Sequence, residues 1–595
     1  MKRSFSGIGV MLAAASAAVF VSGCGGHNHH GDDGLHGPAT LSILSSKAEY
    51  VSGGSVLLKA RLPLGGAGKG FTVIVGKTNV TSSFVPVADD EYVGLVKGLA
   101  DGQNTIVLTP AKNAALSASL TVTNYPISGP MFSGPHIAPF ICQTGSLKLP
   151  DGSTLKTVPN DPNCSAETNV QYVYRSSATN AFLPLANPKA PPADVANITT
   201  ASGEKAPYIV RVETTTIDRG VSQITMLFAP SKDAEPSPIS RPRNWNGKLV
   251  YGHGTGCAGG WYISGANFGY APLNDTWLSR GYAVATNTLN HPTNSCNPVL
   301  AGEVTSMTKE YFIKRYGVPT YTITTGTSGG AYTSLQVADA FPGLFDGVFI
   351  DATFPDALAI ALSGMDAHLL SNYFYGNRWR SSATFTSAQQ AAVPGYANAM
   401  AMFASGNQMG RTDPVPGRSA PSYPGIADYT SAVWNAAVPV ELRYDPNGPT
   451  PTFSGARPTV FDENVNVYGR ARNPLDPSGN STYALRPYDN VGVQYGLAAL
   501  NAGAITVQQF LDLNDQIGGF DTDANPVRAR SSASIDAIKR IHQAGVILSG
   551  GGGLASLPIM DTTNIYGEDN SNYHLQWEHF AVRARLTEAN GDAAN

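Results

Sequence analysis

Between residues 248 and 350, short apolar runs alternate with stretches that can form helices. The apolar runs are Lys248–Tyr251, Gly281–Ala285, Tyr321–Thr325 and Gly347–Ile350, and the helical stretches include 304–316 and 331–340. Strands that alternate with helices are typical of a parallel sheet covered by helices. The sequence therefore predicts an α/β domain in this region.

One of these runs leads into Gly326-Thr327-Ser328-Gly329-Gly330, which fits the pattern G-x-S-x-G. In this pattern a strained turn between a strand and a helix exposes the serine hydroxyl, and glycines avoid the clashes of so tight a turn. The match follows a predicted strand and opens a helix that stops before Pro342, which is the placement the turn requires. We therefore expect Ser328 to be a catalytic nucleophile; the alternative is a glycine-rich turn in which Ser328 only caps the helix.

A nucleophilic serine needs hydrogen-bond donors for the oxyanion that forms on the substrate. One expected donor is the N–H of Gly329, directly after the serine. The second is expected from the loop that follows an earlier strand, where Gly254 and Thr255 stand. This loop has another interpretation, as a structural glycine turn fixed by a disulfide at Cys257.

The N-terminus has the pattern of a signal peptide over residues 1–23. Lys2 and Arg3 precede a mostly apolar stretch from Ile8 to Val21, which is too short to span a bilayer. The following Val-Ser-Gly-Cys resembles a lipobox, which implies cleavage before Cys24 and a lipid on its sulfur. We expect a lipid-anchored outer membrane protein facing the periplasm or the cell surface; an ordinary signal peptide with a coincidental cysteine is the alternative.

Residues 24–40 read as a flexible tether, in which a histidine-rich tract (residues 27–36) is the only hint of metal binding. Residues 41–125 show short runs of period two between glycine-rich turns, which predicts a small β-sandwich domain. Its residues include no chemical cluster, so we assign it no chemistry. A segment rich in proline and glycine from residue 126 marks the boundary to the α/β core, whose first part is expected over 126–356.

Composition narrows the compartment and the partners. Charged residues make up only 14% of the chain and the net charge is −4, so the basic surface of a nucleic-acid binder is not expected. Without Cys24, an even number of cysteines remains, which favours disulfides in an oxidising compartment. Proximity suggests Cys142 with Cys164 and Cys257 with Cys296, and the other pairings stay open. No zinc spacing, phosphate loop or dinucleotide motif occurs in a suitable context, so no metal or cofactor is expected.

From about residue 357 to 545 the alternation of strands and helices is lost, and an insertion of this size predicts a lid or cap. Its aromatic residues provide either a surface for an apolar acyl group or the core of the lid itself; they include Tyr373, Phe374, Tyr375, Trp379, Tyr423, Tyr429 and Trp434. The core resumes over 546–595, with expected strands at Val546–Leu548 and Leu557–Met560 and a helix from His574 to Glu588.

Several motifs together resemble the α/β-hydrolase fold. They are Gly247–Gly256, Gly281–Thr286, Gly326–Gly330 and Phe341–Gly347. The chain is similar in particular to a family of secreted bacterial proteins distantly similar to tannases, feruloyl esterases and hydroxybutyrate-oligomer hydrolases. The similarity extends to Val51–Gly54 and Gly129–Pro135, and so covers most of the chain. It implies a Ser–His–acid triad and hydrolysis of esters or related acyl bonds in small or oligomeric substrates, but it does not imply one substrate.

The triad partners are harder to choose. The expected chain order is serine, acid, histidine, which makes Asp561 the first choice for the acid, with Asp569, Asp351 and Asp356 as alternatives. His574 and His579 follow Asp561, and we expect His574 to be the general base. The last strand of the fold, with the loop that normally bears the histidine, is not evident after this helix. A histidine from elsewhere (His253, His291 or His368) or a chain that lacks its base therefore stay as alternatives.

The sequence thus predicts a serine esterase. Its rivals are a serine peptidase or acyltransferase of the same fold, and a non-catalytic binding lipoprotein built on a hydrolase scaffold.

Overall fold

The computed structural model describes residues 37–63, 70–200, 203–256, 263–291, 294–295, 297–375, 384–398, 438–446, 448–457, 460–522, 526–564 and 574–595. The predicted signal peptide, Cys24 and most of the tether lie outside these residues, as do Cys257, Cys296 and Asp569. No helix within the described ranges is long and apolar enough to cross a membrane.

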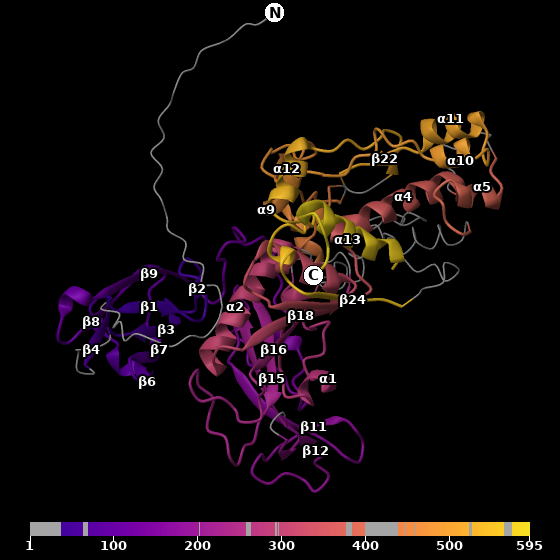
Figure 1. The fold of residues 1–595 in the computed structure, drawn as a ribbon. Helices are drawn as coiled ribbons and strands as arrows, with labels where there is room; N and C mark the ends of the chain where they lie inside the picture. Colours follow the sequence, from indigo (N-terminus) through magenta and orange to yellow (C-terminus); the bar gives the residue numbers. More distant parts are fainter. Residues whose placement is uncertain are drawn as a thin grey trace, which may run out of the picture.

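A nine-stranded mixed sheet forms the centre of the molecule (Figure 1). Its strand order is β11-β10-β14-β15-β17-β16-β18-β19-β24, and the strands from β17 to β24 run parallel. The strands are β10 (Asn169–Arg175), β11 (Phe182–Pro184), β14 (Ile209–Ile217), β15 (Gly220–Leu227), β16 (Lys248–Gly252), β17 (Ala283–Asn287), β18 (Tyr321–Thr327), β19 (Gly347–Asp351) and β24 (Ile559–Thr562). The parallel half agrees with the sequence prediction. The antiparallel half, before residue 228, was not predicted.

Side chains that alternate along the central strands point to opposite faces of the sheet. Leu249 and Tyr251 pack on one face with residues of α2 (Pro298–Tyr316), α3 (Gly329–Ala340) and α13 (Gln576–Asn590). Val250 points to the other face, where Leu278 of the short helix α1 (Asp275–Leu278) covers it. Both faces of the parallel strands are therefore buried, as a sheet of this kind requires.

Residues 40–125 form two sheets that share one hydrophobic cluster. One contains β1 (Thr40–Ile43), β3 (Ser55–Arg61), β7 (Glu91–Lys97) and β6 (Phe84–Ala88), and the other β2 (Val51–Ser52), β9 (Ala118–Tyr125), β8 (Gly102–Pro110), β4 (Phe71–Val75) and β5 (Thr78–Asn79). Buried polar contacts join this part to α2. The N–H of Ser52 donates to Glu310 at 3.0 Å, and Nζ of Lys314 donates to the carbonyl oxygen of Ser52 at 2.7 Å.

A long insertion separates β19 from β24 in the chain and packs next to α13 (Figure 1). Its elements are α4 (Ala357–Tyr375), α5 (Ser387–Ala392), α8 (Val460–Glu463), α9 (Val465–Tyr468), β20 (Arg470–Arg472), β21 (Thr482–Ala484), α10 (Leu497–Asn501), α11 (Val507–Gln516), β22 (Gly519–Phe520), β23 (Pro526–Val527) and α12 (Ile535–Gln543). A further hairpin, β12 (Asn197–Thr199) with β13 (Lys205–Pro207), lies outside the central sheet.

The insertion shares a hydrophobic cluster with the core, which contributes Tyr332 of α3 and Phe354, and Tyr373 and Phe374 are buried in this cluster. These two aromatics are therefore core residues. Trp379, Tyr423, Tyr429 and Trp434 lie outside the described residues, and so does the side chain of Tyr375.

Two further expectations have clear outcomes. Cys142 and Cys164 form a disulfide, which agrees with the pairing by proximity. Val546–Leu548 is not a strand, which corrects the prediction. The N–H of Leu548 donates to the carboxylate of Asp356 at 3.1 Å instead of to a neighbouring strand, and short apolar runs do not distinguish strands from other buried segments.

Candidate active site

Ser328 occupies a sharp turn between β18 and α3. Its φ and ψ are 58° and −119°, a conformation that residues with a side chain rarely adopt. The turn is held by the N–H of Ser328, which donates to the carbonyl oxygen of Asp351 at 3.0 Å. Strained backbone of this kind gathers at functional sites. It is also the geometry that the G-x-S-x-G pattern predicts.

The glycines on both sides of Ser328 are required by space. A Cβ on Gly326 would lie 2.4 Å from the backbone of Gly330, and a Cβ on Gly330 would lie 2.5 Å from the carbonyl oxygen of His253. Both distances are far below van der Waals contact. The turn and the loop after β16 therefore pack backbone against backbone.

His574 meets Ser328 from a segment 246 residues further along the chain. Its Nε2 lies 2.9 Å from Oγ of Ser328, and its ring packs against Phe354 with centroids 5.1 Å apart. The residue stands just before α13, which begins at Gln576. A hydrogen bond of this length is what a nucleophile and its general base make.

The surroundings of His574 favour a neutral imidazole. Burial lowers the pKa of its ring below the ordinary value of 6.5, and the nearby His579 lowers it further. The carboxylate of Asp351 acts in the opposite direction. A ring that is neutral near pH 7 can accept the proton of a serine hydroxyl.

The structure pairs the predicted acid with the other histidine. Oδ2 of Asp561 lies 2.7 Å from Nδ1 of His579, and its Oδ1 accepts a hydrogen bond from Oγ1 of Thr353 at 2.7 Å. The expected contact between Asp561 and His574 is thereby corrected. Asp561 lies within β24 and faces α13, where His579 is more than one helical turn beyond His574.

The alternative acids differ in whether they act on His574 or bind other groups. Asp351 ends β19, and its charge acts on His574. Asp356 binds Arg585 and the N–H groups of Ala359 and Leu548, so its oxygens are taken by structural partners. Asp569 lies outside the described residues. Among the acids that the structure describes, Asp351 is therefore the one whose charge raises the pKa of His574.

The alternative histidines lie elsewhere. His253 and His368 are fully buried, and His368 stacks on Phe520 inside the insertion. His253 contacts Thr324 and Ser334, each at 3.0 Å. Burial lowers the pKa of His291 to about 4.

Of the expected N–H donors for the oxyanion, that of Gly329 is placed as predicted and that of Gly254 is not. The N–H of Gly329 is the first of α3 and has no acceptor within the helix. In contrast, the N–H of Gly254 donates to the carbonyl oxygen of Asn290 at 2.9 Å, and that of Thr255 donates to Gly269 at 3.3 Å. Gly254 is thus engaged by the neighbouring loop, which corrects its expected role. Thr255 has the longer bond.

Residues 41–595 match the sequence profile of the "Tannase-like family of unknown function (DUF6351)". The chain belongs to this family. The parallel sheet and the turn at Ser328 give the core of this tannase-like protein the architecture of the α/β-hydrolase fold.

The family member also resembles individual proteins. An o-phthalyl amidase of Xanthobacter agilis is 33% identical over 117 residues, which is 19% of this chain and 24% of the amidase. Feruloyl esterase B of Aspergillus oryzae is 16% identical with a TM-score of 0.29, covering 72% of this chain and 76% of the esterase. A tannin acyl hydrolase of Aspergillus niger is 11% identical with a TM-score of 0.26, covering 74% and 77%.

Proposed function

We propose that this tannase-like protein is a serine hydrolase that cleaves carboxylic esters through an acyl-enzyme. The 2.9 Å contact between Oγ of Ser328 and Nε2 of His574, at a strained turn after a parallel strand, carries the proposal. Ser328 attacks the ester carbonyl while its proton passes to His574. His574 then protonates the leaving alcohol, and water hydrolyses the acyl-enzyme by the reverse sequence.

The charges of the reaction have nearby partners. The N–H of Gly329 is the first donor for the oxyanion. The N–H of Thr255 is the second, once it leaves the carbonyl oxygen of Gly269 and donates to the oxyanion instead. The carboxylate of Asp351 stabilises the imidazolium of His574, which its effect on the pKa of that ring supports. Asp561 fixes His579 instead and has no direct part.

Further assignments belong to the same proposal. Residues 41–125 serve as a β-sandwich module. Residues 357–545 serve as a lid, since they share a hydrophobic cluster with Phe354, whose ring packs beside His574. Residues 1–24 direct the protein to the outer membrane as a lipoprotein. Its substrates are then small or oligomeric esters outside the cytoplasm.

A fluorophosphonate probe tests the serine. We expect labelling of the wild type and none of Ser328→Ala. Ser334→Ala is the matched control, because Ser334 also contacts a histidine but is fully buried. A folded wild type that takes up no probe would favour the non-catalytic binding lipoprotein.

An amidase is the second candidate, favoured by the 117-residue similarity to the o-phthalyl amidase. A pair of substrates that share the acyl group and differ in an ester or amide bond separates the two. We expect the ester to be cleaved faster. A higher kcat/KM for the amide would assign the protein to amide hydrolysis.

A further inference from the structure

A buried cation stands at the turn between β14 and β15. Arg219 is only 8% exposed, and its guanidinium lies over the ring of Phe140, 3.8 Å from the centroid. Its Nε has no acceptor among the residues that the structure describes. Buried donors nearly always have hydrogen-bond partners, and a buried donor without one is costly. Arg219 therefore calls for an explanation beyond packing.

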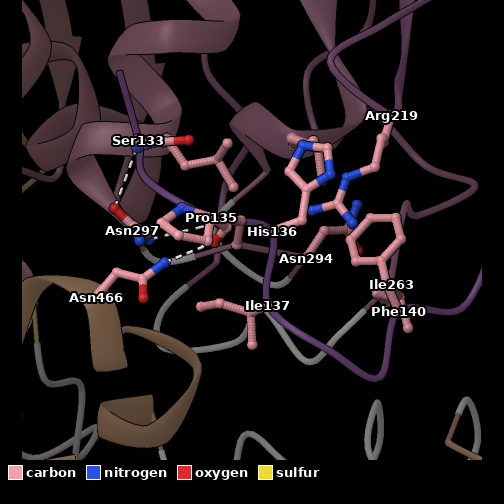
Figure 2. Close-up of a pocket in the computed structure, with 13 residues that line it drawn as sticks. Ser133, Pro135, His136, Ile137, Phe140, Arg219, Ile263, Asn294, Asn297 and Asn466 are labelled. Carbon is pink, nitrogen blue, oxygen red and sulfur yellow. Dashed lines mark hydrogen bonds between the residues drawn. The ribbon is translucent and has the colours of Figure 1, made fainter. Parts of the chain in front are cut away.

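Arg219 faces a pocket between the core, the segment after residue 130 and the insertion. Figure 2 shows the guanidinium between the rings of His136 and Phe140, with Asn294 nearby. The described residues that line the pocket include no aspartate or glutamate. Inside the pocket, the guanidinium of Arg219 thus meets no acidic side chain among these lining residues. The free volume is about 40 Å³, which has room for about three water-sized groups.

The two basic groups of the pocket differ in charge. Burial lowers the pKa of Arg219 to about 10, so the guanidinium stays protonated at neutral pH. Burial and the neighbouring Arg219 lower the pKa of His136 to about 4, which keeps its ring neutral. Nε2 of His136 also has no partner in the described part of the chain. The pocket therefore offers one cation and one neutral ring that can donate a hydrogen bond.

Two acids, Asp218 and Glu303, lie behind Arg219, and their charges favour its protonated form from outside the pocket. Glu303 accepts hydrogen bonds from the N–H groups of Phe132 and Ser133 and from Oγ of Ser133. Complete burial and the charge of Glu303 raise the pKa of Asp218 well above its ordinary value. Neither acid lines the pocket. Arg219 is thus left as the charge that a ligand would meet.

The pocket lies at the same edge of the sheet as Ser328. Because β15 runs antiparallel to β17, the turn before β15 lies at the carboxyl ends of the parallel strands. Ligands of open α/β sheets bind at this edge. Three strand spacings separate β15 from β18, about 14 Å.

We propose that this pocket binds the terminal carboxylate of an organic acid, held by Arg219 with His136 as a neutral donor. A carboxylate matches the planar guanidinium in two parallel hydrogen bonds. It also fits a volume of about three heavy atoms and a site with a single positive charge. A phosphate dianion is larger and would leave one charge unpaired.

Direct binding tests the site without requiring catalysis. The full-length Ser328→Ala protein is titrated with benzoate and with neutral benzamide by calorimetry. We expect benzoate alone to bind, and Arg219→Met to weaken its binding at least about tenfold. His136→Leu is a second, milder variant, expected to weaken benzoate binding a few-fold. Arg241→Met is the matched control, because Arg241 contacts Val318 and Trp245 at the opposite edge of the sheet.

Two sources of the carboxylate are distinguishable, the substrate itself and a free acid. The first rests on the proposed esterase function. A diester is compared with the corresponding monoester that keeps a free carboxylate. For a substrate site, the ratio of kcat/KM for the acidic over the neutral ester falls toward one in Arg219→Met. For a free-acid site, Arg219→Met loses benzoate binding, but its ratio of kcat/KM for the acidic over the neutral ester equals that of the wild type.

If the wild type hydrolyses no ester, the titration still decides the site. Absence of benzoate binding to Ser328→Ala overturns the proposal. Equal binding by a folded Arg219→Met, checked by its thermal unfolding, overturns it as well.

Discussion

Two serine–histidine contacts of similar length lie along helix α3. They differ in the burial and backbone conformation of the serine and in the surroundings of the histidine. Ser328 precedes the helix with a positive φ and is 7% exposed, and His574 reaches it from the far end of the chain. Ser334 is inside the helix and fully buried, and its Oγ donates to the carbonyl oxygen of Gly330 at 2.8 Å.

The histidines differ in the same sense. Burial lowers the pKa of His253 to about 3, so the ring beside Ser334 takes up no proton at neutral pH. Burial also lowers the pKa of His574, but the carboxylate of Asp351 opposes this. A serine–histidine distance by itself, without a strained turn at the serine, is therefore weak evidence of catalysis. A hydroxyl at a strained turn and an imidazole that can become charged are the stronger signs.

The largest effect is expected from the serines. Ser328→Ala should reduce kcat for an ester by at least about a thousandfold, because no other hydroxyl replaces the nucleophile. Ser334→Ala should retain kcat and lose about 1 kcal/mol of unfolding free energy with its buried hydrogen bonds. Steady-state kinetics and denaturant unfolding measure the two. Equal losses of activity in both variants would contradict the distinction.

The two histidines near the C-terminus come next. His574→Gln should lower kcat by at least about a thousandfold, as expected for a general base. His579→Gln removes a ring that binds Asp561 and should cost less than about tenfold. A larger loss in His579→Gln than in His574→Gln would exchange their roles.

The packing between the turn at Ser328 and the loop after β16 predicts an effect on stability. Gly330→Ala places a Cβ 2.5 Å from the carbonyl oxygen of His253, so we expect a loss of about 1–3 kcal/mol in unfolding free energy. Gly492→Ala is the control, because nothing lies within 4 Å of its added Cβ. Thermal or denaturant unfolding measures both. An unchanged Gly330→Ala would show that the two backbones are not in contact.

The smallest effect is a shift of pH dependence. The base acts when neutral, so kcat/KM should rise with pH through a midpoint below 6.5, the ordinary pKa of histidine. Removing the acid in Asp351→Asn should move this midpoint down, whereas His579→Gln should move it up. The same pH profile is measured for Asp561→Asn and Asp569→Asn, which remove the other two candidate acids. A midpoint that moves with Asp569→Asn and not with Asp351→Asn would assign the acid to Asp569.

The local part of this site was predictable from sequence. Gly326, Ser328 and Gly330 lie within five residues, and their pattern encodes a turn whose sterics do not depend on distant segments. The parallel strands followed from the order of elements. The expected order of the triad left His574 and His579 after Asp561, of which His574 was preferred. The disulfide between Cys142 and Cys164 also joins near neighbours in sequence.

The errors concern contacts that only the folded chain defines. Asp561 was expected to meet His574, but the direction of its side chain from β24 selects His579. The N–H of Gly254 was expected to be available, but Asn290 on another loop accepts it. Val546–Leu548 has the apolar character of a strand, yet Asp356 takes the N–H of Leu548. Arg219 carried no signal, because an isolated arginine in a sequence does not reveal burial.

Peptide mapping by mass spectrometry tests the central claim most directly. The wild-type protein is reacted with a fluorophosphonate, digested and searched for the modified residue. We predict a single covalent adduct on Ser328. An adduct on Ser334 or on another residue, with Ser328 unmodified, would contradict the account.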